Sequence, residues 1–251
     1  LTSTLAPMTD EALKEPLRIQ LASAHFKKGD HEVAAKLFEA VLTDYPESKL
    51  RASMLFQAGE SRLRLKETVA ARDHFAEAFK IGGTDKVLAE TITMRLGETQ
   101  ALTDQHEQAA GTYRHFLGNF KESKWIRNAQ FGLAYALEKG GKPDQAIGEY
   151  ARLLDDPKTV DLWTVRGRFQ TGECLFNMQK YERATAEFVN IEINYKQYPD
   201  WQAKAALEVG RVLLAEEKTD QATQNFKDVI KRYPKENAAI VARQYLDELR
   251  K

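Results

Sequence analysis

The chain has 251 residues, of which 43% are hydrophobic and 29% are charged, a composition typical of folded globular proteins rather than of disordered ones. Lysine plus arginine equals aspartate plus glutamate, 37 of each, so the formal net charge is zero. General nucleic-acid binding and polybasic attachment to membrane surfaces both need clustered positive charge, and this balance argues against both. Cys174 is the only cysteine, which excludes an internal disulfide, and no apolar stretch approaches the roughly 20 residues that span a bilayer.

Residues 1–14 are predicted to be a lead-in to the main fold. Thr9 or Asp10 is a suitable cap for a short helix, and Pro16 is expected to interrupt that helix with a kink or a fresh start near Glu15. The chain begins with Leu1 rather than with methionine, so we expect any targeting signal to lie upstream of it.

From residue 15 onward one pattern recurs six times, at steps of 37 or 38 residues. A small anchor residue lies in the second half of each unit: Ala34, Ala71, Ala109, Ala146, Ala184 and Ala222. An aromatic residue follows four positions later: Phe38, Phe75, Tyr113, Tyr150, Phe188 and Phe226. Another small residue precedes the anchor by twelve positions: Ala22, Gly59, Gly97, Ala134, Gly172 and Gly210. Such regular columns indicate an internal repeat.

Each unit is predicted to be a pair of amphipathic helices, because its apolar residues recur at spacings of three and four. Small residues let the two helices approach, and the aromatic fills the space beside them. Short polar turns join the helices, and the dipeptides Tyr45-Pro46, Tyr198-Pro199 and Tyr233-Pro234 are predicted to end helices. The units span about 15–48, 49–85, 86–122, 123–160, 161–198 and 199–235, and a capping helix covers about 236–251.

This combination of small residue, polar turn, alanine, aromatic and Tyr-Pro resembles the tetratricopeptide repeat (TPR). The resemblance implies an all-α, right-handed solenoid of six TPR-like helix pairs plus the C-terminal capping helix, in a single domain over residues 1–251. The usual repeat has 34 residues, whereas these units are three or four residues longer. The longer form resembles repeats of bacterial envelope proteins such as the Tol–Pal-associated coordinator and the outer-membrane assembly lipoprotein.

Three tryptophans, Trp125, Trp163 and Trp201, share one column of the repeat. A ladder of aromatic rings could stack sugars or a proline-rich ligand. Leucines occupy the same column in the earlier units, which favours packing against the preceding unit instead. We therefore expect the tryptophans to lie in the core.

Glu60, Glu98 and Glu173 share another column, on the first helix of their units, and the resemblance implies that this column faces the concave groove. Three carboxylates there could hold a basic or amide-rich segment of a partner. The alternative is that they pair with neighbouring bases and adjust the stacking of the units. The candidate bases are Arg62, Arg64, Arg95 and Arg166.

The remaining motifs predict no catalysis. His31-Glu32 and His106-Glu107 lack the second histidine of a zinc-protease helix, and Cys174 is expected to be a small buried filler. No serine, cysteine or lysine has an assignable base partner, so no nucleophile, metal or cofactor is predicted.

The sequence therefore predicts a non-catalytic scaffold that binds a partner protein or peptide in its concave groove, with a place in the bacterial periplasm or cell envelope. The alternatives are a structural or oligomerisation module of a larger protein, a homo-oligomer and a cytoplasmic location. The residues predicted to contact the partner lie on first helices: Glu60, Arg64, Glu98, Tyr135, Lys139, Arg166, Glu173, Asn177 and Arg211.

Overall fold

The computed structural model describes residues 11–82, 85–154 and 161–250, and in these ranges the chain forms thirteen α-helices and no strand. The predicted all-α fold is confirmed. The chain divides into two compact units, Leu1–Gly132 and Leu133–Lys251, and the boundary falls inside helix α8 (Ile126–Lys139). A single domain over residues 1–251 stays a prediction.

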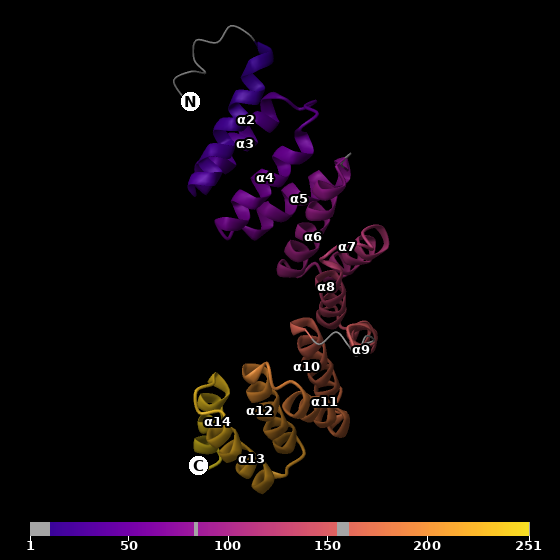
Figure 1. Ribbon diagram of the computed structural model, residues 1–251, viewed down its shortest axis with the longest axis vertical. Coiled ribbons are helices and arrows are strands. Elements are labelled where there is room, and N and C mark those ends of the chain that lie inside the picture. The colour runs from indigo at the N-terminus through magenta and orange to yellow at the C-terminus, as the bar shows by residue number, and fades with distance from the viewer. Residues whose placement is uncertain (1–10, 83–84, 155–160, 251) are drawn as a thin grey trace. The chain divides into compact units, whose positions relative to one another are not determined.

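In the first unit, each helix packs against the next one along the chain, so that helix hairpins stack in sequence order (Figure 1). Two first helices of this unit, α2 and α4, also contact each other. The helices before α8 are α2 (Glu11–Lys28), α3 (His31–Asp44), α4 (Arg51–Arg64), α5 (Thr68–Ile81), α6 (Lys86–Leu102) and α7 (His106–Asn119).

The second unit repeats this arrangement, and α10 and α12 are its neighbouring first helices. Its helices after α8 are α9 (Pro143–Arg152), α10 (Leu162–Asn177), α11 (Tyr181–Asn194), α12 (Pro199–Ala215), α13 (Thr219–Arg232) and α14 (Asn237–Glu248). The last of them covers the end of the stack: α14 buries Ala238, Ala239 and Ala242, and Tyr245 stacks on Phe226 with ring centroids 4.9 Å apart.

The aromatic column packs against the small-residue column, as predicted. A Cβ atom on Gly172 would stand 2.6 Å from the ring of Phe188, and one on Gly97 would stand 2.8 Å from the ring of Tyr113. Real Cβ atoms do not approach other atoms so closely, so these helix crossings need glycine. The largest fully buried side chains of the described core are five rings of this column and one ring from outside it, Phe116: Phe38, Phe75, Tyr150, Phe188 and Phe226 belong to the column.

Each turn between the two helices of a pair contains one residue with positive φ, between 58° and 92°. These residues recur at the repeat spacing: Gly29, Lys66, Asp104, Gly141, Gln179 and Glu217. Residues other than glycine rarely adopt this left-handed conformation, and four of the six turns nevertheless do so. The packing of the hairpin therefore determines the turn, and glycine is not required there.

Two predictions about prolines need correction. Helix α2 runs from Glu11 to Lys28 with Pro16 inside it, so no new helix starts near Glu15, and a kink there stays a prediction. The packing of Ile19 and Ala22 into the core that α2 shares with α3 offsets the one helical hydrogen bond that proline removes. Pro199 begins α12 instead of ending α11, because proline at the first helical position loses no intrahelical bond.

The tryptophans are less buried than expected, although Trp201 packs against the apolar core of the second unit, as expected. Trp125, Trp163 and Trp201 are each half-buried, and each has a cation over its ring, at 5.2, 4.7 and 4.4 Å from the ring centroid. The column lies at or just before the start of the first helix, and the ring of Phe169 packs against Trp201 with the centroids 5.3 Å apart.

Candidate functional site

Glu60 and Glu98 of the first unit meet at a single arginine. Arg95 on α6 reaches back to Glu60 on α4, with Arg95 Nε 2.7 Å from Glu60 Oε1. Arg95 Nη1 also donates to Glu98 Oε2 at 2.8 Å. The Glu60 side chain is only 10% exposed, whereas those of Arg95 and Glu98 are 35% and 38% exposed. Two carboxylates around one guanidinium leave this group of three residues with one excess negative charge.

A cavity of about 150 Å³ adjoins this group, between α6 and the start of α8. Met94 and Trp125 give it apolar walls, and Arg95, Glu98 and Asn128 bring polar groups to it, together with Thr91. Arg64, which was predicted to share this face, is an exposed residue at the end of α4 and does not line the cavity.

The second unit has a related group of two glutamates and one arginine. Here the arginine, Arg211, holds a position of the predicted column. Glu173 on α10 lies 3.8 Å from Arg211 Nη1 on α12, and Arg211 also pairs with Glu208, one turn earlier on α12. Glu208 is 10% exposed in its side chain. Burial, followed by the charge of Glu173, raises the pKa of Glu208 from its ordinary 4.5 to about 8. Arg211 also lies over the ring of Phe176, 5.1 Å from its centroid.

The other predicted residues of the second unit lie nearby on first helices. Lys139 Nζ lies 5.2 Å from the ring centroid of Tyr135 and 3.0 Å from Glu138 Oε1. Arg166 lies 4.7 Å from the ring centroid of Trp163, and burial lowers its pKa. Asn177 is exposed at the end of α10.

Sequence reasoning missed two buried acids, Glu138 and Glu208. Glu138 Oε2 accepts hydrogen bonds from Tyr150 Oη at 2.9 Å and from Gln170 Nε2 at 3.0 Å. The two acids lie three residues after and three residues before the predicted column, respectively, and so share its helix face. That spacing was the signal that could have found them.

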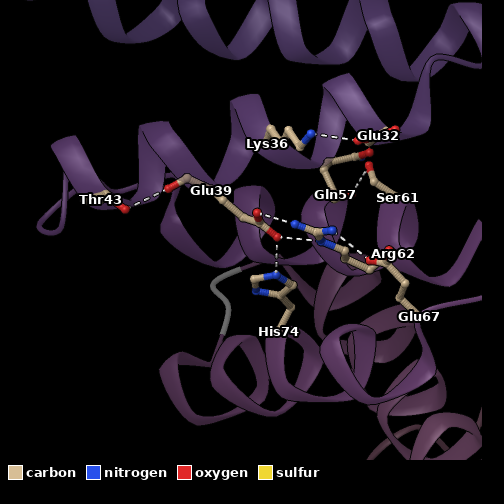
Figure 2. Close-up of polar contacts among 9 residues, drawn as sticks. All are labelled: Glu32, Lys36, Glu39, Thr43, Gln57, Ser61, Arg62, Glu67 and His74. Carbon is tan, nitrogen blue, oxygen red and sulfur yellow. Dashed lines mark hydrogen bonds and ion pairs between the residues drawn. The ribbon is translucent and has the colours of Figure 1, made fainter. Parts of the chain in front are cut away.

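The four candidate bases differ in what they contact. Arg95 pairs with Glu60 and Glu98, as the ion-pair alternative requires. Arg62 lies on another face of α4, where it binds Glu39 and Glu67, and Figure 2 shows this separate network. Ion pairing between stacked first helices is therefore present at the predicted column.

The one cysteine is unsuited to nucleophilic chemistry. Cys174 is 1% exposed, and burial, followed by the charge of Glu138, raises the pKa of its thiol to about 12. A thiol with this pKa is uncharged at neutral pH, and the thiolate is the nucleophilic form.

Family models agree with this architecture. Two models described as tetratricopeptide repeat match residues 19–85 and residues 128–159 and 203–236, which together make up more than half of the chain. The chain belongs to the tetratricopeptide-repeat family. Its three matched segments coincide with helix pairs of both compact units.

Solved structures show the same TPR-like helical fold at low sequence identity. The quorum sensor NprR from B. thuringiensis is 13% identical, with a TM-score of 0.61 over 99% of this chain and 72% of its own. YrrB, described as a TPR protein with an unusual peptide-binding site, is 18% identical, with a TM-score of 0.54 over 84% of this chain and 99% of its own. PilF of Pseudomonas aeruginosa is 16% identical, with a TM-score of 0.54 over 93% and 97%. No curated protein matches the sequence.

Proposed function

We propose that this TPR chain is a non-catalytic scaffold that binds a partner protein or peptide along the polar face of its first helices. This is the face that carries Glu60, Glu98 and Glu173. The observation that carries the proposal is the group of Glu60, Arg95 and Glu98 beside an open cavity. Helical repeats bind through extended surfaces built from equivalent positions of successive repeats. YrrB, which shares the fold, has a peptide-binding site according to its description.

The location that we propose is the bacterial cell envelope. The support is the length of the repeat, 37 or 38 residues, which resembles that of envelope proteins. In the part of the chain that the structure describes, no helix is long and apolar enough to cross a membrane.

The test is affinity capture from separated envelope and soluble fractions of the source cell. The test variant replaces Glu98 and Glu173 with lysine, and it leaves the deeply buried Glu60 unchanged so that the fold survives. The control variant replaces Glu122 and Glu182 with lysine, which makes the same change of charge at exposed positions that do not line the cavity. Circular dichroism confirms that both variants fold.

A partner that binds the wild type and the control variant but not the test variant would support the scaffold and its binding face. The fraction in which it is found would test the location. Equal capture by all three proteins would overturn the binding face, and capture by none would overturn the scaffold in favour of a structural module.

A further inference from the structure

The cavity between α6 and α8 is too small for a typical small-molecule ligand. Its volume is about 150 Å³, whereas pockets for small molecules usually measure about 300–1,000 Å³. A cavity of this size suits one long side chain of a partner.

The walls of the cavity suit an apolar stem. Met94 is 6% exposed and presents a flexible thioether, and the half-buried ring of Trp125 lies beside it. Lysine and arginine bury their methylene stems along such surfaces while their charged heads stay in polar surroundings. An indole ring also attracts cations, and the ammonium of Lys124 already lies 5.2 Å from the centroid of Trp125.

The charges around the cavity suit a cationic head. Glu98 lines the cavity with a carboxylate that is 38% exposed, and Arg95 divides its one positive charge between Glu98 and Glu60. The three groups together carry one net negative charge. Lys124 carries a positive charge nearby. It does not line the cavity, and its side chain is exposed.

We infer that this cavity binds a lysine or arginine side chain of the partner, with the stem between Met94 and Trp125 and the head on Glu98. The inference rests on the proposed function, because it names the chemistry of the segment that the scaffold binds. A neutral side chain of the same shape would fill the cavity without neutralising the excess negative charge, and an acidic one would be repelled by it.

The experiment uses three short peptides as probes, each acetylated and amidated: Gly-Arg-Gly, Gly-citrulline-Gly and Gly-Glu-Gly. Citrulline has nearly the shape of arginine without its charge. Binding to the full chain is followed by NMR through the indole N–H signals, and the signal of Trp125 is identified by its loss in Trp125→Phe. We expect the arginine peptide to shift this signal and the other two to bind roughly tenfold more weakly, as the loss of a charge-assisted hydrogen bond implies.

Two variants separate this site from general charge attraction. Glu98→Gln should weaken the binding of the arginine peptide roughly tenfold. Glu122→Gln, an equal change of charge at an exposed position of the same unit, should leave its affinity unchanged. Thermal melting shows whether each variant is folded.

Equal binding of the arginine and citrulline peptides, preference for the glutamate peptide, or wild-type affinity in Glu98→Gln would each overturn the inference. So would the absence of any shift at millimolar peptide. These outcomes leave the scaffold proposal standing wherever the capture experiment finds a partner that depends on the polar face. A failed capture together with arginine-specific shifts would instead contradict the scaffold alone.

Discussion

The ring of Phe75 on α5 lies against the backbone of Gly59 on α4, so closely that a Cβ atom on Gly59 would stand 2.6 Å from Phe75 Cε1. Both residues are fully or almost fully buried, and Phe75 packs with Ala71 and Leu96 in one apolar cluster. The contact joins the two helices of a pair, and the same contact recurs in other pairs. The small-residue column is therefore a requirement of helix approach.

Gly59→Ala should lower the free energy of unfolding by about 1–3 kcal/mol, because the added methyl group displaces the Phe75 ring from a well-packed site. Gly111→Ala is the matched control: Gly111 lies on the exposed face of α7, with nothing within 4 Å of a built Cβ. That change should raise stability by about 0.5–1 kcal/mol, since alanine is the better helix former. Urea denaturation followed by circular dichroism measures both, and wild-type stability in Gly59→Ala would show that the ring has room to move.

Glu39 on α3 connects three helices through its carboxylate (Figure 2). Arg62 on α4 donates from Nε to Oε1 at 2.7 Å and from Nη2 to Oε2 at 2.5 Å, and His74 Nε2 on α5 lies 3.0 Å from Oε1. Burial acts to raise the pKa of Glu39, but the hydrogen bonds from Arg62 and His74 outweigh it, and the pKa lies below its ordinary 4.5.

A lowered pKa means that the folded state favours the charged form of Glu39. The resulting stability is fully present above pH 4.5 and is lost as the pH falls through the folded-state pKa. Glu39→Gln should therefore destabilise the protein by about 1–2 kcal/mol at pH 7, with a smaller difference from the wild type in acid. Denaturation at pH 7 and at pH 4 measures the difference.

Glu32→Gln provides the control for Glu39→Gln. Glu32 pairs with Lys36 on the surface of the same helix, where solvent screens the pair (Figure 2). Its replacement should have a smaller effect at both pH values. If the two variants lose equal stability, the network around Glu39 contributes no more than a surface ion pair.

Contacts within one helix pair were predictable from the sequence. The glycine and aromatic columns are sixteen residues apart in the sequence. Residues of the two columns contact each other in the structure, as Gly172 and Phe188 do. Periodic spacing determines which residues face each other across a hairpin, so one sequence with six copies of the pattern contains enough information. The positions of the turns between the two helices of a pair were predictable for the same reason.

Contacts between successive pairs were harder to predict. Arg95 was one of four candidate bases for Glu60, and the sequence does not say which long side chain reaches across to the next first helix. Glu208 shares the helix face of the predicted column, but spacing alone does not separate a buried glutamate on that face from an exposed one. The half-burial of Trp201 depends on Phe169, whose ring centroid lies 5.3 Å away, and on the position of a helix start.

Glu208 gives a prediction with the opposite dependence on pH from that of Glu39. Its pKa is raised to about 8, first by burial and then by the charge of Glu173, so the folded state favours the protonated form. Below pH 4.5 the carboxyl group is protonated in the folded and unfolded states alike. As the pH rises from 4.5 to about 8, only the unfolded state releases the proton readily, and stability falls.

Glu208→Gln should remove this loss, because the amide keeps an acceptor for Arg211 and carries no charge to bury. The melting temperature of the wild type should therefore fall between pH 5 and pH 8 by several degrees more than that of the variant, since 1 kcal/mol corresponds to about 2–4 °C in a chain of this size. Glu182→Gln on the exposed face of α11 controls for the change of net charge and should follow the wild type. Parallel melting curves for Glu208→Gln and the wild type across this range would mean that Arg211 holds Glu208 in its charged form throughout.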